Sequence, residues 1–344
     1  MTKYILRRFV NYAILTGLAT VFAYIAASSF FQPRNRYLGR NPPIDEASID
    51  AILSAHGVND KDPVLLRTWW WIENFVTAPF MDKLGTDLND RSVVHQMLGD
   101  PSHWLLFWEQ GWLGRSGVSL RLLIIGSLLA ALVGVAAGVW GAVRQYKASD
   151  QIISYSSFIL ISTPTFVGGV LLMIIATKFN QAMGGQLIRF TGAYTPGISG
   201  FWPTTWDFIS HLLLPTIALT LFGAAGYSRY QRAVMLDVLG SDFIRTARAK
   251  GATRTRALIK HGLRVALIPM STYFAYNFGT LVSGSAFLEI VFSWSGMGQY
   301  GITAVQQSDV NALAGTVLFS AILVLFASTL SEFLYAALDP RVRI

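Results

Sequence analysis

The chain alternates between long apolar stretches and polar segments that carry nearly all of its charge. Six stretches of roughly 19 to 26 residues contain no Asp, Glu, Lys or Arg. About 20 apolar residues suffice to cross the hydrocarbon core of a bilayer, and within lipid such a segment must be helical so that its backbone polar groups are satisfied. The pattern therefore predicts an all-α integral membrane protein with six transmembrane helices. We expect them within residues 1–31 and at about 121–143, 152–177, 210–228, 265–288 and 310–331.

The composition supports this prediction. Of 344 residues, 53% are apolar and 13% are charged, whereas ordinary globular chains carry about 25% charged residues. The first apolar stretch follows Lys3 and Arg8, as the apolar region of a secretory signal peptide would. It is longer than such a region, and the small residues Ala26–Ser28, where cleavage would occur, are followed almost at once by Phe30. We therefore expect a retained first helix. The chain has no cysteine, which excludes disulfides and thiolate metal sites.

The distribution of charge predicts an orientation in the membrane. Residues 229–264 hold nine Lys or Arg against two acids, residues 32–116 hold eight against eleven, and residues 293–309 hold no Lys or Arg. Short cytoplasmic loops carry the excess of Lys and Arg. We therefore expect cytoplasmic N and C termini and an extracytoplasmic segment between the first two helices. The same placement explains the net charge of +8 without a nucleic-acid partner.

The extracytoplasmic segment is too long to be a plain connection. It contains a predicted short helix at 43–56, with Gly57 as its stop. Its tryptophans fit two interpretations, either a belt at the membrane interface or a cap on which a delivery protein docks, and the sequence leaves both open. The aromatic groups are Trp69, Trp70 and Trp71, and then Trp104, Phe107, Trp108 and Trp112.

Between the fourth and fifth crossings the pattern predicts two short basic helices separated by a glycine. Asp242 starts the first helix and complements its dipole, Gly251 ends it in a left-handed conformation, and Thr253 caps the second. Such a hairpin suits insertion into a cleft of another protein, whereas the alternative is ordinary cytoplasmic charge in contact with anionic lipid. The second helix carries a basic stripe formed by Arg256, Lys260 and Arg264.

This segment resembles the cytoplasmic loop of the dipeptide/oligopeptide/nickel permease family of ABC importers. The resemblance rests on Asp242-Phe-Ile-Arg-Thr-Ala-Arg-Ala-Lys-Gly251 and His261-Gly-Leu-Arg-Val-Ala-Leu-Ile-Pro269. It covers nearly the whole chain and implies the type I ABC importer transmembrane fold, with a permease core at 117–344. Further matching pieces are Leu6–Arg8, Gly111–Ser116, Leu212–Pro215, Glu289–Gly298 and Tyr335–Arg343. The chain departs from the family pattern at Phe31–Arg36, at Ser295 and in an apparent insertion at 77–98.

The resemblance also implies the function. The chain would be a non-catalytic permease subunit in a bacterial cytoplasmic (inner) membrane, importing di- or oligopeptides, with nickel or glutathione as alternatives within the family. It would pair with a second homologous permease, two ABC ATPase subunits or one fused ATPase, and an extracytoplasmic substrate-binding protein. No Gly-x-x-x-x-Gly-Lys motif is present, so ATP and Mg would be bound by the ATPases and this chain would bind no cofactor.

Specific residue roles follow from the same resemblance. The first basic helix would be the coupling helix that sits in a groove of the ATPase, and a second group would link it to the fifth crossing. The coupling residues are Asp242, Phe243, Arg245, Thr246, Ala247, Arg248 and Gly251, and the linking residues are His261, Arg264 and Pro269. The residues that contact substrate are not predicted.

Other chemistries find little support in the residues. A secondary transporter or channel needs ion sites in mid-membrane, and no stretch has an acid at its centre. An intramembrane enzyme would need a cluster of His, Asp or Glu, and the five histidines lack metal-binding spacing. Glu289 and Glu332 lie at the ends of the fifth and sixth crossings, where we expect interfacial anchors.

Overall fold

The computed structural model describes residues 2–39, 41–81, 92–99 and 113–338. Within these ranges the chain is helical and contains no β-strand. Among the described residues, five helices are long and apolar enough to cross a membrane: α1 (Thr2–Phe30), α5 (Gly114–Val143), α7 (Thr165–Met183), α8 (Phe201–Leu239) and α13 (Val310–Leu338). A further long helix, α11 (Leu263–Val291), runs through the predicted fifth crossing.

Helices α5 and α8 form the most extensive helix–helix contact among the described residues. A Cβ atom on Gly134 of α5 would lie 2.5 Å from the Tyr227 Cβ and 2.7 Å from the Ala224 carbonyl oxygen of α8. One α-helical turn further, a Cβ on Gly138 would lie 2.6 Å from the Ser228 carbonyl oxygen. Lipid tails are as apolar as the helices, so association in a membrane depends on such close approach of small residues. The glycines therefore hold α5 against α8 as the centre of the fold.

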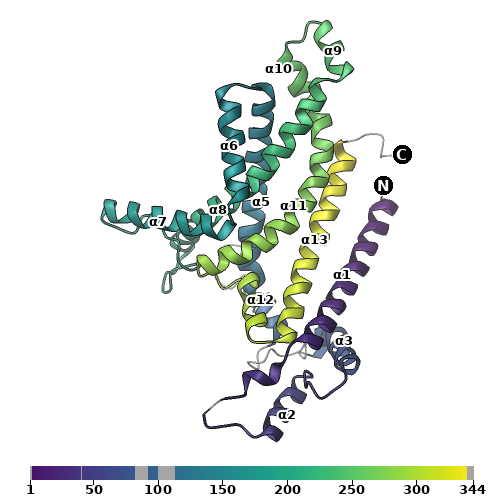
Figure 1. Ribbon diagram of the computed structural model, residues 1–344, viewed down its shortest axis with the longest axis vertical. Coiled ribbons are helices and arrows are strands. Elements are labelled where there is room, and N and C mark those ends of the chain that lie inside the picture. Colours follow the sequence, from purple (N-terminus) through teal and green to yellow (C-terminus); the bar gives the residue numbers. More distant parts are fainter. Residues whose placement is uncertain (1, 40, 82–91, 100–112, 339–344) are drawn as a thin grey trace.

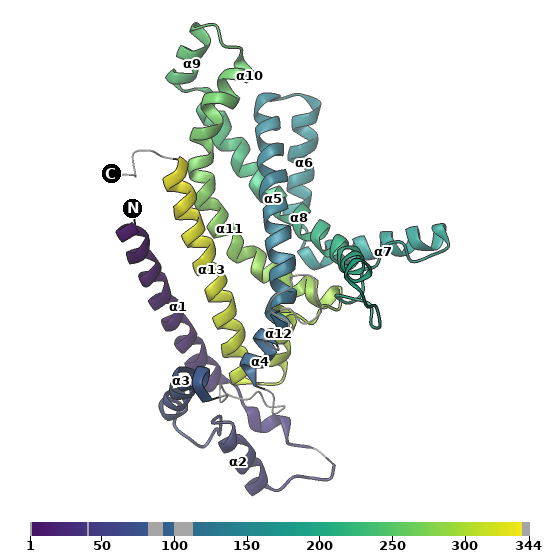
Figure 2. The ribbon, with the colours of Figure 1, turned by 180° about the vertical axis from the view of Figure 1, so that it is seen from behind.

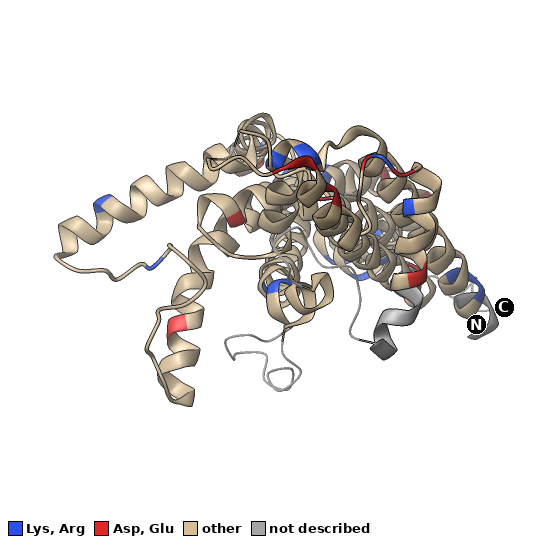
Figure 3. Ribbon diagram, turned by 90° about the horizontal axis from the view of Figure 1, so that it is seen from below, with Lys and Arg blue, Asp and Glu red and all other residues tan. Residues whose placement is uncertain are grey.

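The two ends of the bundle differ in character. The N terminus, the C-terminal end of α13 and the hairpin of α9 (Asp242–Ala249) and α10 (Arg254–Ala257) lie toward one end (Figures 1 and 2). The opposite end carries α2 (Glu46–Ala55), α3 (Val64–Met81), α4 (Val93–Leu98) and α12 (Met297–Gln306) (Figure 2). Both basic and acidic positions gather around α2 and α3 when the molecule is viewed from that end (Figure 3).

The expected third crossing at 152–177 is not one continuous helix. It is divided between α6 (Ala148–Ser162) and α7, with Thr163 extended at ψ 126° and Pro164 at ψ 138°. Proline lacks the amide hydrogen that would continue the helix and pushes the preceding residue into an extended conformation. As a result α7 projects sideways from the bundle (Figures 1 and 2), and the prediction of a single span here is wrong.

The short helix predicted at 43–56 is confirmed as α2. Asp45 caps it by accepting a hydrogen bond from the Ser48 amide at 3.2 Å, and Gly57 follows it at φ +67°. Its buried face, Ile49 and Leu53, packs in a cluster with the outer end of α1. The segment thus has a small hydrophobic core of its own that rests on α1.

The first tryptophan group divides between two environments. The Trp71 ring stacks on Tyr24 of α1 at 4.8 Å, whereas Trp69 is 65% exposed. One face of α3 therefore fixes the segment to the bundle while the other remains open, which is compatible with both earlier interpretations. The second tryptophan group, much of the expected insertion and the basic C-terminal tail with Arg341 and Arg343 lie outside the described residues.

Candidate functional site

The candidate site is the helical hairpin at 240–262, which projects from the end of α8 (Figure 1). Its first helix, α9, begins at Asp242 and is closed by two backbone hydrogen bonds, from Gly251 N to Arg248 O at 2.9 Å and from Ala252 N to Ala247 O at 3.2 Å. This is the Schellman arrangement, which requires a left-handed residue after the helix. Gly251 has φ +90°, so the predicted glycine cap is confirmed.

One side of α9 is buried against the rest of the hairpin. Ile244 is 1% exposed and packs in a cluster with Val238 of α8 and Leu258. Gly262 permits this packing, because a Cβ there would lie 3.0 Å from Val238 and 3.4 Å from Ile244. Sequence analysis missed Ile244 and favoured Phe243. The i,i+3 spacing of Ile244 and Ala247 on one face was the available signal.

The other side of α9 is open to solvent. Phe243 is 42% exposed, and Arg245 and Arg248 are exposed as well. Arg245 lies 3.6 Å from Asp242 in an exposed pair, which leaves the guanidinium available to a partner because such pairs are weak. The Thr246 hydroxyl donates to the Asp242 carbonyl at 2.9 Å and so serves the helix itself. The exposed surface of α9 therefore offers an aromatic ring and positive charge.

The second part of the hairpin continues directly into α11. Thr253 caps α10, since its hydroxyl accepts a hydrogen bond from the Arg256 amide at 3.3 Å, as predicted. A π-helical turn at Leu258–Gly262 then joins α10 to α11. The sequence analysis did not predict this turn. A π-turn contains one residue more than an α-helical turn, so it rotates the later members of the predicted basic stripe around the helix axis relative to the earlier ones.

The three predicted linking residues lie along this connection. His261 is exposed in the π-turn, and Pro269 lies inside α11 without ending it. The Arg264 Nε donates to the Leu338 carbonyl at 3.3 Å, joining the start of α11 to the end of α13. The hairpin is thus connected covalently to α8 and α11, and through Arg264 to α13.

A buried ion pair joins a fourth helix, α6, to α8 and so to the helices that carry the hairpin. The Arg232 guanidinium of α8 donates to both carboxylate oxygens of Asp150 on α6, at 2.6 and 2.7 Å. Asp150 also accepts from the Tyr146 amide at 3.0 Å, and the hydrogen bonds from Arg232 hold the pKa of Asp150 below its usual range. Sequence analysis missed this pair because its members lie far apart along the chain.

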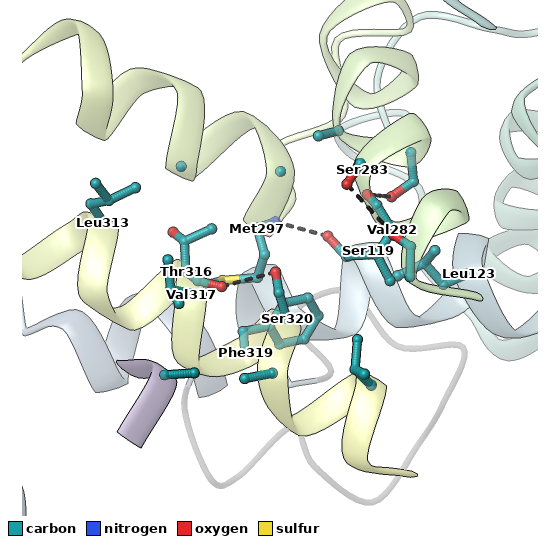
Figure 4. Close-up of a pocket in the computed structure, with 18 of the residues that line it drawn as sticks. Ser119, Leu123, Val282, Ser283, Met297, Leu313, Thr316, Val317, Phe319 and Ser320 are labelled. Carbon is teal, nitrogen blue, oxygen red and sulfur yellow. Dashed lines mark hydrogen bonds between the residues drawn. The ribbon is translucent and has the colours of Figure 1, made fainter. Parts of the chain in front are cut away.

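Glu289 corrects another expectation. It is 1% exposed rather than an interfacial anchor. The Ser119 hydroxyl donates to its Oε1 at 2.5 Å, and the Gln299 amide donates to its Oε2 at 3.0 Å, so the carboxylate caps the start of α12. Ser119 in turn accepts from the Met297 amide at 2.8 Å (Figure 4). Glu289 therefore orders the connection between α11 and α12.

The carboxylate lies beside an open cavity of about 1020 Å³ lined by α1, α5, α11, α12 and α13. Ser283, Thr316 and Ser320 line it together with apolar side chains such as Leu313 and Phe319 (Figure 4). The Ser320 hydroxyl donates to the Thr316 carbonyl at 3.0 Å, so part of the polar lining is already engaged within α13.

Comparison with known proteins relates this architecture to a family. Residues 134–344 match the model of the binding-protein-dependent transport system inner membrane component. The chain is 44% identical over 346 residues to the oligopeptide transport system permease protein OppB of Mycobacterium tuberculosis, covering 100% of both chains. It is 31% identical over 344 residues to the oligopeptide transport system permease protein AppB of Bacillus subtilis, covering 99% of both.

A third relative covers a smaller part. The dipeptide transport system permease protein DppB of Escherichia coli is 34% identical over 250 residues, which is 69% of this chain and 73% of that protein. The family match includes the whole hairpin, from α8 through α11, and the similarity to the first relative extends over the outer segment as well. The chain therefore belongs to the family of binding-protein-dependent transport system inner membrane components.

Proposed function

We propose that this chain is the peptide-conducting permease subunit of an ATP-driven importer. The observation that carries the proposal is its similarity, over its full length, to a relative named as an oligopeptide transport permease. Di- or oligopeptides would be delivered from outside by a substrate-binding protein. A second homologous permease would complete the pathway, and two ABC ATPases or one fused ATPase would bind ATP and Mg and drive the cycle.

The proposed orientation places the hairpin and both termini in the cytoplasm and the α2–α3 segment outside. The basic excess at 229–264 supports this orientation, and so does the position of the hairpin and the termini toward one end of the bundle (Figure 1). We retain six crossings, with the third made of the broken pair α6 and α7 held within the assembled complex. Irregular backbone at membrane depth is tolerated where protein or a water-filled path covers it.

In this proposal α9 is the coupling helix. Its open face would enter a groove of the ATPase, while its buried face, through Ile244, transfers movement to α8 and the π-turn. Because α8 is one helix of 39 residues ending at the hairpin, displacement of α9 would move α8 and α11 together. His261, Arg264 and Pro269 would carry that movement into the membrane-spanning part of α11.

Gly251 and Gly240 provide a matched pair of positions for a test. No atom lies within 4 Å of a Cβ built on Gly251, so this chain leaves room for a side chain there. Its φ of +90° nevertheless costs a non-glycine residue about 1–2 kcal/mol. Gly240 at the other end of α9 has φ −78°, which any residue adopts. Three variants therefore separate the effect of backbone strain from the effect of a side chain on the surface that would contact the ATPase: Gly251→Leu, Gly251→Asn and Gly240→Leu.

The assay is co-purification of the ATPases with the permease pair, followed by ATP-dependent uptake of a labelled oligopeptide in proteoliposomes. We expect Gly251→Leu to lose both, Gly251→Asn to keep part of both because asparagine tolerates the left-handed region, and Gly240→Leu to match the parent complex. If Gly251→Leu binds ATPases and imports peptide like the parent, the coupling role of α9 is wrong. If the parent imports nickel or glutathione but no peptide, the substrate class is wrong.

A further inference from the structure

Gln231 is a buried amide in the contact between α8 and α5. Its side chain is 0% exposed, and neither its amide nitrogen nor its amide oxygen has a hydrogen-bond partner among the described residues. It lies on the face of α8 that also buries Tyr227 and Met235, four residues before and after it. A polar side chain therefore occupies an interior position that is flanked along the helix by an aromatic ring and an apolar side chain.

The surface opposite Gln231 is a glycine of α5. A Cβ atom on Gly138 would lie 2.8 Å from the Gln231 Cβ, so the two helices meet here almost without intervening side chains. Ala142, one turn further along α5, is fully buried and packs in the same cluster as Met235. Gly138 and Ala142 thus offer the amide of Gln231 no polar side chain as a partner.

The unpaired amide raises the free energy of the arrangement described here. A buried polar group that gives up its hydrogen bonds to water and gains none in return shifts an equilibrium against the state that buries it by about tenfold or more. Because Gln231 is fully buried within this chain, a peptide, a lipid or a partner subunit reaches its amide only after the helices have moved. The amide therefore favours any arrangement of α5 and α8 in which it finds a partner.

The neighbouring ion pair shows how α8 can move and still remain attached. Arg232 holds Asp150 of α6 by two hydrogen bonds, and a Cβ on Gly141 of α5 would lie 2.9 Å from the Asp150 Oδ1. A roll or tilt of α8 about this point moves the Gln231 side chain along α5 without breaking the pair. The carbonyl oxygens of α5 beside Gly138 are not shielded by a Cβ, and a helix carbonyl retains a second lone pair. The backbone of α5 thus supplies acceptors for the displaced amide.

We propose that Gln231 keeps the α5–α8 contact poised between two arrangements of the transport cycle. In the arrangement described here the amide is unpaired, and in the other it is hydrogen-bonded to the backbone of α5. The proposal rests on the ATP-driven cycle proposed above, in which displacement of α9 moves α8. The unpaired amide lowers the free energy needed to leave the first arrangement. Gln231 is thus a positioning residue of the cycle, buried away from both peptide and ATPase.

The first test measures the stability of the full chain by detergent titration in mixed micelles. Gln231→Met replaces the amide with an apolar group of similar length, and Gln151→Met is the matched control, because Gln151 is exposed on α6. We expect Gln231→Met to raise the ratio of folded to unfolded chain by about tenfold and Gln151→Met to leave it within about twofold. Unchanged or lower stability of Gln231→Met means that the amide is already hydrogen-bonded, for example to a buried water, and overturns the proposal.

The second test measures ATP-driven uptake of a labelled oligopeptide by the complete complex, with its binding protein, in proteoliposomes. We expect Gln231→Met to lower uptake by about tenfold, because the arrangement that it stabilises is favoured by the same factor, while Gln151→Met matches the parent complex. A merely structural role of Gln231 would lower uptake only together with stability. Uptake by Gln231→Met equal to that of the parent complex overturns the proposal.

The third test observes the two arrangements directly. The chain contains no cysteine, so spin labels can be attached to Lys147→Cys and Asp237→Cys, two exposed positions before α6 and on α8. We expect two distance populations in the parent complex during ATP turnover, and Gln231→Met should enrich one of them about tenfold. A single population in the parent complex, or an equal ratio in both complexes, overturns the proposal. If the parent complex shows both populations and the shift but imports no peptide, the peptide function fails and the role of Gln231 stands.

Discussion

Removal of the Asp150 carboxylate is predicted to destabilise the packing of α6 against α8 by about 3 kcal/mol. The Asp150 side chain is 3% exposed and that of Arg232 is 26% exposed. Deleting one member of a buried, bidentate pair costs about 3–5 kcal/mol, because the other charge stays buried without compensation. Asp150→Ala belongs at the low end of this range because a quarter of Arg232 remains in contact with water. The Tyr146 amide loses its acceptor as well.

A double-mutant cycle measures the pair itself. The free energy of unfolding is determined for the parent chain, Asp150→Ala, Arg232→Ala and the double variant by detergent titration in mixed micelles, followed by circular dichroism. We expect the double variant to lose about 2 kcal/mol less than the sum of the single variants, as for residues in direct contact. Asp242→Ala is the control, because its pair with Arg245 is exposed, and it should not change the measured stability. Additive effects of Asp150→Ala and Arg232→Ala, or an Asp150→Ala value equal to that of Asp242→Ala, would refute the reasoning.

Three further predictions follow from packing and charge. Ile244→Ala should lower the local stability of the hairpin by about 2–4 kcal/mol, because Ile244 is 1% exposed. Limited proteolysis should then cleave residues 240–262 before the bundle unfolds. Protection of this segment equal to that in the parent chain would contradict the packing. Gly134→Ala should destabilise the bundle by about 1–3 kcal/mol, because its Cβ would lie 2.5 Å from the Tyr227 Cβ of α8. Gly17→Ala on α1 is the control, because no atom lies within 4 Å of a Cβ there, and it should leave the stability measured by the same detergent titration unchanged. Hydrogen bonds from Arg34 lower the pKa of Asp60, so the pair's contribution is complete above the ordinary aspartate pKa of about 3.9 and is lost as pH falls through the lowered value. Protease resistance of the outer segment should therefore stay constant from pH 7 to about 4.5 and fall only in stronger acid, and a loss near pH 6 would contradict this assignment.

Local chemistry allowed several features to be predicted from the sequence. Charge-free stretches locate membrane helices because the bilayer penalises every unpaired polar group along them. The helix starts and stops follow from residue type and position alone, because the residues concerned act on the backbone within four residues of themselves. They are Asp45, Gly57, Gly251 and Thr253. The resemblance of the hairpin to a permease loop depends on the same contiguous run of residues.

Contacts between distant segments were decided only by the tertiary structure. Ile244 is buried because α8 and the π-turn converge on one face of α9, and Asp150 meets Arg232 because α6 packs against α8. Glu289 was expected at an interface, yet Ser119 and the start of α12 enclose it. By itself the sequence determined that this protein is a helical membrane protein with a basic hairpin between its fourth and fifth apolar stretches. Only the tertiary structure decided which helices pack against the hairpin and where buried polar groups meet, because periodicity specifies a helix face but not the element that covers it.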